Sequence, residues 1–364
     1  MHRSLITLLM SGALIIALIV PSQSMQRGAP ARNTTVSASS SNNGIAEKER
    51  LSPQLIEEVF WWFPEDTQTV SVVRGPFKIT APLEEPPANI TALEYTDLSL
   101  RMAPLGMFYA IDDGSFLGPL LGRNVSLCVE GSRRFRPPKQ LGQMLYEGCD
   151  INIFQEGLGP ARASLIAQLK SKANKVLSVA GAQVMVFEKR FENDTWTILV
   201  AMPTPTVLLC ATNLAYLTQV LNRMHQKGNK RALPDELPEW KYVNTTARFW
   251  ALRHYDKNDA PNDPSSPLSG ELLDANWPDK QAVGIVFSLD PAHSNVATIK
   301  YLSANKDALM LFNKQHDLPN KQFHPVIRES TSGVIEMLVS LDSLEETGLF
   351  LLVLLSLLGH AVYL

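Results

Sequence analysis

The segment QVMVFEKRFENDTWTILVAMPTPTVLLCA spans residues 183–211 and carries the strand pattern from which the expected fold class follows. Val184 and Val186 alternate with other residues over 183–190, and a second run covers residues 195–202 after Glu-Asn-Asp at 192–194. Two such runs joined by a short polar turn predict a β-hairpin. The apolar run over residues 206–211 predicts a third strand.

A helix is expected directly after these strands. Apolar residues recur at helical spacing over residues 213–226, and Gly228 follows as a stop signal: the apolar positions are Leu214, Leu217, Val220, Leu221 and Met224. A strand-rich stretch followed by a helix is thus the basic unit that this part of the sequence predicts.

The same order of elements is expected elsewhere in the chain. Strands are predicted near Val125 and Ile151, before a helix over residues 161–178. Further strands over 247–254, 282–289 and 296–302 precede a predicted helix over 303–315, and a last strand covers 333–341. We therefore expect an α+β fold with antiparallel sheets and loosely recurring strand-strand-helix units.

The N-terminus has the three parts of a signal peptide. Arg3 gives a charged start, residues 5–20 are apolar and uncharged, and small residues at Ser22 and Ser24 form a cleavage site. Residues 1–24 are therefore predicted to direct export, with cleavage after Ser24, although an uncleaved signal anchor is the alternative. Residues 25–50 are polar and should form a flexible tether before an α+β body over 51–341, as one large or two small domains.

The C-terminal tail over 342–364 is predicted to be a hydrophobic helix. Ser343 and Glu346 form a capping box, and no side chain carries a formal charge from Gly348 to Leu364. The segment is short for a bilayer crossing, so a membrane anchor and a buried terminal helix both remain open. A lipid-attachment signal is a third, weaker reading, because residues 334–339 resemble a strand rather than a polar spacer.

Composition and charge bound the partners. The chain has 364 residues, of which 45% are hydrophobic and 19% charged, and its net charge is −3. This is ordinary globular composition. A near-neutral surface argues against nucleic-acid binding. The location that we expect is extracytoplasmic: periplasmic, in the cell envelope or secreted, with possible membrane attachment through the tail.

Three cysteines occur, at Cys128, Cys149 and Cys210. In an oxidising compartment, Cys128 and Cys149 are the pair that we expect to form a disulfide, since both lie near predicted strands. Cys210 lies in an apolar strand, where a buried, inert thiol is expected.

The sharpest enzymatic pattern is Ser303 with Lys306, which matches the S-x-x-K spacing of a serine nucleophile and its lysine. No K-T-G element accompanies it, and a serine at that position is also the expected N-cap of a helix. A hydrolase with a site assembled from dispersed residues is thus an alternative to a binding protein.

The strongest charge cluster is a basic loop, and it offers a second candidate site. Its cations are Arg133, Arg134, Arg136 and Lys139. Outside the cytoplasm such a loop could bind anionic glycans or lipid head groups. The alternative interpretation is a solvated loop between strands.

No metal site or cofactor is predicted. The histidines show no ligand spacing, and no phosphate-binding or dinucleotide-binding motif occurs. The leading interpretation is therefore a non-catalytic binding or scaffolding protein of the cell envelope or exterior.

Overall fold

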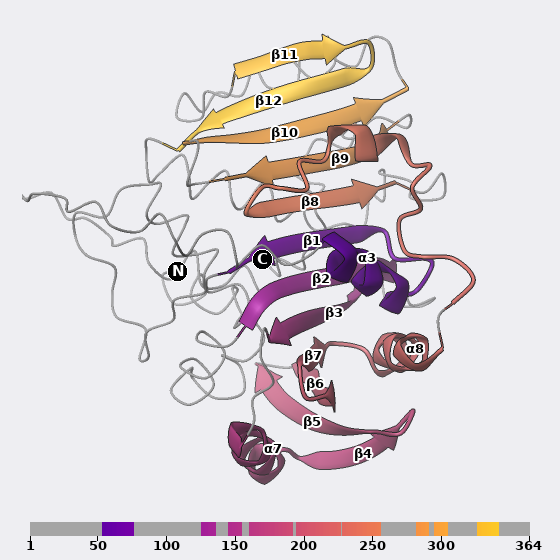
Figure 1. Ribbon diagram of the computed structural model, residues 1–364, viewed down its shortest axis with the longest axis vertical. Helices are drawn as coiled ribbons and strands as arrows, with labels where there is room; N and C mark the ends of the chain where they lie inside the picture. The colour runs from indigo at the N-terminus through magenta and orange to yellow at the C-terminus, as the bar shows by residue number, and fades with distance from the viewer. Residues whose placement is uncertain are drawn as a thin grey trace, which may run out of the picture.

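Twelve strands form one antiparallel sheet (Figure 1). The computed structural model describes residues 53–75, 125–135, 145–154, 160–191, 194–226, 228–255, 282–290, 295–304 and 326–341. The strand order is β11-β12-β10-β9-β8-β1-β2-β3-β7-β6-β5-β4. The strands are β1 (Thr69–Arg74), β2 (Val125–Phe135), β3 (Leu145–Phe154), β4 (Lys175–Val179), β5 (Ala182–Phe191), β6 (Asp194–Thr204), β7 (Val207–Ala211), β8 (Phe249–His254), β9 (Ala282–Leu289), β10 (Val296–Ser303), β11 (Val326–Thr331) and β12 (Val334–Ser340).

The sheet has a buried core on each side. Helices α3 (Pro53–Trp62) and α8 (Leu214–His225) and the 3-10 helix η2 (Pro238–Tyr242) pack on one side, which we call the front face. Helix α7 (Pro160–Lys172) packs on the other side, the back face. Successive strand residues alternate between the faces, so Val72 belongs to the front core and Val73 to the back core.

The expectation of an α+β fold is wrong, because one continuous antiparallel sheet dominates the described structure and α3, α7 and α8 are its only described α-helices. One predicted helix accounts for part of this error. The helix expected over 161–178 ends at Lys172, and Val176 and Leu177 pair with β5 as part of β4. Ser303, expected to start a helix, is the last residue of β10. Strand pairing outweighs local helix preference at β4. Residues 305–315 of the second predicted helix lie outside the described residues.

The sheet consists of two halves with the same strand arrangement. From the centre outward, the first half runs β1-β2-β3-β7-β6 and the second runs β8-β9-β10-β12-β11. In each half, the three strands nearest the centre are the first three of that half in the chain. They are followed outward by the last strand of the half and then by the last but one. Strands β5 and β4 extend the first half alone. The recurring unit is therefore this set of five strands, rather than the strand-strand-helix unit that the sequence suggested.

Irregularities in strand register recur at equivalent places in the two halves. In the first half, register shifts where Val125 of β2 pairs with Phe154 of β3. In the second half, it shifts where Ala282 of β9 pairs with Ser303 of β10. A second shift occurs between β6 and β7 and again between β11 and β12. Because such bulges are local backbone features, their repetition supports residue-by-residue equivalence of the halves.

The two halves meet where β1 pairs with β8. Ser71 lies opposite Ala251 at the middle of this antiparallel pair. Matching hydrogen bonds lie beyond its two ends: the Arg74 amide donates to the Arg248 carbonyl at 2.9 Å, and the His254 amide donates to the Gln68 carbonyl at 2.8 Å. An approximate two-fold axis through the centre of this pair therefore relates the halves.

The leader, the tether and the tail lie outside the described residues. This applies to the predicted signal peptide at 1–24, the tether at 25–50 and the hydrophobic tail at 342–364. Within the described ranges, no helix has the length and apolar character needed to cross a membrane.

Close packing on the front face depends on a glycine. Phe63, which follows α3, is fully buried, and a Cβ atom on Gly131 of β2 would lie 2.5 Å from two atoms of its ring. The ring therefore occupies the space that a side chain at position 131 would need.

We predict that Gly131→Ala lowers the free energy of unfolding by about 1–3 kcal/mol, because a rigid buried ring cannot move aside without strain. The matched control is Gly148→Ala on the adjacent strand, where the nearest atom to a new Cβ is the Ser132 Cβ at 3.3 Å. Urea denaturation of both variants checks this, and equal losses at the two positions would contradict it.

Candidate functional site

Three polar side chains lie together on the back face of the first half, among buried neighbours. Glu130 of β2 lies directly opposite Asp150 of β3, and Asn152 follows two residues along β3 on the same face. Directly opposed residues have Cβ atoms about 4.5–5.5 Å apart. We call Glu130, Asp150 and Asn152 the polar cluster.

The equivalent positions in the second half are all apolar or aromatic. Ser71 and Ala251 face each other at the axis and are therefore equivalent. Glu130 pairs with Ser71 and Phe287 pairs with Ala251, so Phe287 is the equivalent of Glu130. By the same pairing, Ile299 is the equivalent of Asp150 and Tyr301 that of Asn152. All three second-half side chains are buried in the back core. One backbone arrangement thus carries core residues in one half and acids and an amide in the other.

Asp150 is held in an environment that favours its neutral form. The residue is 8% exposed. Burial is the main cause that raises the pKa of its carboxyl well above the usual range, and the neighbouring Glu130 raises it further. A protonated Asp150 can donate a hydrogen bond, whereas an ionised carboxylate can only accept one.

Asn152 is fully buried, and neither polar atom of its side chain has a hydrogen-bond partner. A carboxamide offers two N–H donors and an acceptor oxygen. Leaving such atoms unpaired in the interior costs about 1–3 kcal/mol. Asn152 therefore makes no hydrogen bond that would explain its presence in the core.

Two thiols flank the polar cluster. Cys128 lies opposite Asn152, and Cys210 lies opposite Asp150. Both are buried, and burial is the main cause that raises their pKa values, so both remain protonated and unreactive. The prediction that Cys210 is buried is confirmed.

The disulfide expected between Cys128 and Cys149 is not present in the structure, where both cysteines are free. Cys149 lies opposite Gly131, whereas Cys128 lies opposite Asn152. The thiols also face opposite sides of the sheet. Three positions along a strand correspond to roughly 10 Å, beyond the ~7 Å limit between Cα atoms for a disulfide.

The basic loop is only partly within the described residues. Arg133 and Arg134 belong to β2, and nothing is described of the Arg134 side chain, while Arg136 and Lys139 lie outside the described ranges. The structure therefore places Arg133 alone.

Arg133 already has two carboxylate partners. Its guanidinium donates to Asp66 at 2.6 Å and to Glu147, where the Nε–Oε2 distance is 2.8 Å. It also lies over the ring of Tyr216 in α8, with its Cζ atom 5.2 Å from the centroid. These contacts join α8 to the sheet and neutralise the charge that the binding hypothesis assigned to Arg133.

The proposed nucleophile Ser303 lies at the end of β10. It is 8% exposed, and its amide donates to the Gly333 carbonyl at 2.8 Å. Lys306 lies outside the described residues, so the structure does not bring the pair together.

A second departure from the two-fold pattern lies on the front face. His254 and Gly284 face each other where the first half has Arg74 and Leu127. The fully buried Glu239 fills the space left by Gly284, and its Oε1 lies 2.7 Å from the His254 Nδ1. A buried carboxylate is expected to have a hydrogen-bond partner, and His254 provides one for the Glu239 Oε1.

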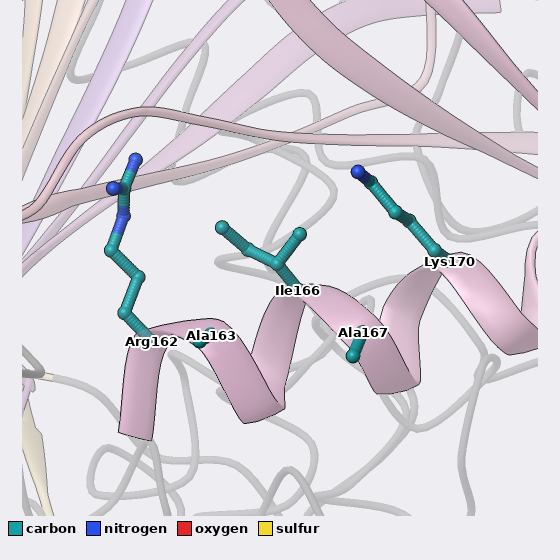
Figure 2. Close-up of a pocket in the computed structure, with 5 residues that line it drawn as sticks. All are labelled: Arg162, Ala163, Ile166, Ala167 and Lys170. Atoms are coloured by element: carbon teal, nitrogen blue, oxygen red, sulfur yellow. The ribbon is translucent and has the colours of Figure 1, made fainter. Parts of the chain in front are cut away.

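A hollow of about 460 Å³ lies along α7, and Figure 2 shows the five residues that line it. Arg162, Ile166 and Lys170 point to the same side of the helix, above Ala163 and Ala167. The Arg162 guanidinium donates to the Met202 carbonyl at 3.4 Å. The described lining comes from one helix and brings no acid–base pair together.

Within the described ranges, no cluster of three or more His, Cys, Asp or Glu side chains could hold a metal ion.

Sequence analysis missed the polar cluster. A usable signal was present in β3, where Asp150 and Asn152 alternate with Cys149, Ile151 and Ile153. Alternation of this kind normally marks a strand with one wet face. Only the cross-strand register shows that Asp150 faces Glu130 and that Asn152 faces Cys128.

We predict that Arg133→Met lowers the free energy of unfolding by about 1.5–3 kcal/mol, because Glu147 would lose a charged partner in a largely buried setting. The matched control is Lys175→Met, whose ion pair with Glu188 is exposed and is worth ~0.2–1 kcal/mol. Denaturant unfolding measures both changes. Retention on heparin should be unchanged by Arg133→Met, and a clear loss of retention in a folded variant would restore the anionic-surface hypothesis.

Comparisons of the chain with models of known protein families, with curated proteins and with solved structures found no match. A functional proposal for this chain therefore rests on its own residues. The internal comparison between the two halves supplies the reference that a relative would otherwise provide.

Proposed function

We propose that the protein is a non-catalytic binding protein of the cell envelope or exterior, and that it holds a small, uncharged polar ligand at the polar cluster. The observation that carries this proposal is Asn152, which is fully buried with both side-chain polar atoms unpaired, on the same face as Asp150. Binding sites commonly combine a mainly apolar surface with a few placed polar groups.

The comparison of the two halves argues against a structural role for these residues. A tyrosine, an isoleucine and a phenylalanine fill the same places in the second half. The fold therefore accepts apolar and aromatic side chains at all three positions. Positions where sequence departs from the packing rules at a cost in stability are those where a functional reason is expected.

The electrostatics favour an uncharged ligand. Asn152 is neutral, and burial favours the neutral form of Asp150. Placing a net charge beside a buried amide carries a large desolvation cost unless an opposite charge compensates it. A group that both donates and accepts hydrogen bonds meets both unpaired atoms of Asn152 without that cost.

Location outside the cytoplasm is part of the proposal and rests on residues 1–24. We predict that the chain, expressed at full length in a secreting host, is recovered with Met25 at its N-terminus, because small residues at Ser22 and Ser24 suit signal peptidase. N-terminal sequencing of the exported protein checks this. Recovery of the chain with an intact leader in the membrane fraction would support the uncleaved anchor instead.

We predict that Asn152→Leu raises the free energy of unfolding by about 1–3 kcal/mol, because it removes two unpaired buried polar atoms at nearly constant volume. The matched control is Asn213→Leu, since the Asn213 side chain caps α8 by accepting from the Tyr216 amide at 3.0 Å. Loss of that cap should cost about 1 kcal/mol.

Urea denaturation of the ligand-free protein compares the two variants. Opposite signs at positions 152 and 213 are the expected result. A loss of stability in Asn152→Leu equal to that in Asn213→Leu would mean that Asn152 has a structural partner, and the proposed function would then lose its basis.

A further inference from the structure

We propose that the outer edge of β11 binds an extended segment of another protein, which adds to the sheet as an antiparallel strand. In chain order, the segment carries an acidic residue opposite Arg328, an apolar residue opposite Ile327 and an apolar residue opposite Val326. This surface belongs to the second half of the sheet and is independent of the polar cluster, so the inference goes beyond the proposed function.

The two halves of the sheet differ in what lies beyond their fifth strand. In the first half, β5 pairs with β6 along its outer edge. In the second half, no described strand lies beyond β11, which ends the sheet (Figure 1). An edge strand presents main-chain N–H and C=O groups that can pair with an added strand. The outer edge of β11 is therefore the place that β5 fills in the first half.

The pairing register gives the correspondence between β6 and β11 residue by residue. Two strands inward from Val200 of β6 lies Asp150. Two strands inward from Ile327 of β11 lies its equivalent, Ile299. Val200 and Ile327 are therefore equivalent positions.

Val326 is exposed where its counterpart is covered. It precedes Ile327 and therefore corresponds to Leu199. Leu199 lies opposite Val186 of β5 and is 2% exposed, whereas Val326 is 61% exposed. Removing such an apolar side chain from water favours association. An apolar residue in the place of Val186 would cover Val326.

Arg328 begins a charged row of the sheet where the first half is apolar. Arg328 faces Glu336, and Glu336 faces Lys300. The Arg328 Nε donates to the Glu336 Oε2 at 2.6 Å, and the Lys300 Nζ lies 3.6 Å from the Oε1. Two cations thus share one carboxylate. The corresponding row of the first half reads Ala201, Leu209 and Ile151.

This row determines the charge expected of the added strand. Val184 of β5 lies opposite Ala201, the counterpart of Arg328. The Arg328 side chain is 60% exposed despite its contact with Glu336, so a further carboxylate can reach it. Opposite charges on facing residues stabilise strand pairing, and like charges destabilise it. An acidic residue in the place of Val184 would bring the row to neutrality.

A second copy of this chain suits the edge less well. When β11 pairs with itself about a two-fold axis, the two registers with the greatest overlap set either Arg328 or Glu329 against its own copy. The strand β4 of another copy can set Leu177 against Val326, but Lys175 then lies opposite Arg328. Like charges thus oppose both arrangements, and the observations favour a different polypeptide.

Peptides that follow the sequence of β5 test the inference, because β5 fills the equivalent place in the first half. Both peptides contain the ten residues of β5; one carries Val184→Glu, and its matched control carries Val184→Lys. Fluorescence anisotropy measures the binding of each labelled peptide to the full exported chain. We expect the Val184→Glu peptide to bind about threefold or more tightly than the control, because only its charge is opposite to that of Arg328. Equal binding, the reverse order or no binding of either peptide overturns the inference.

Three protein variants place the peptide on the edge. Arg328→Glu should reverse the preference between the two peptides, and Val326→Lys should weaken the binding of both. The matched control is Val176→Lys on the opposite edge strand, β4, where Val176 is 44% exposed; it should leave binding unchanged. Circular dichroism shows which variants are folded.

The other outcomes decide against the inference. Binding that Val326→Lys does not weaken, or that Val176→Lys abolishes, overturns the placement on β11, and this comparison stands even if Arg328→Glu does not fold. Sedimentation measures whether the chain associates with itself. A dimer that Val326→Lys dissociates would identify a second copy as the occupant and overturn the choice of another protein.

Discussion

The antiparallel pairing of β1 with β8 is the interaction on which the rest of the structure depends. It joins two five-strand sets into one sheet, and main-chain hydrogen bonds at both ends hold it in register. On the front face the junction is covered by aromatic rings, with Phe60 and Trp240 5.5 Å apart. Arg231 lies over both rings. Because every other strand is placed by successive pairing from this centre, the axis also defines which residues of the two halves correspond.

That correspondence makes the polar cluster interpretable. Burying an unpaired amide or acid opposes folding, and the second half shows that the same backbone accepts Phe287, Ile299 and Tyr301 in the core. The first half therefore carries a cost in stability at Asn152, where both polar atoms of the side chain are unpaired. Where the front face also departs from the pattern, the Glu239 Oε1 is paired with the His254 Nδ1, whereas the Glu239 Oε2 has no hydrogen-bond partner. The Asn152 side chain differs in that neither of its polar atoms is paired.

Local patterns in the sequence predicted the individual elements better than their assembly. The hairpin of β5 and β6, helix α8 and strands β7, β9, β10 and β12 follow from periodicity, and the structure confirms them. Strands β1 and β11 were missed, and β4 was assigned to a helix because its five residues follow α7 almost directly. Pairing between strands far apart in the sequence decided that one sheet forms. The same long-range pairing brings Glu130 to Asp150, so the site could not be derived from single-strand patterns. The ion pair of Arg133 with Asp66 could not be derived either, because the two residues are distant in the chain.

The central claim is that the polar cluster is a ligand site within a sheet whose other half shows how the fold packs without one. A crystal structure of the exported protein tests it most directly. The account predicts density for a small polar ligand within hydrogen-bond distance of both the Asn152 Oδ1 and Nδ2. An ordered water molecule or a protein group paired with both Asn152 atoms, with no ligand on the back face, would contradict it.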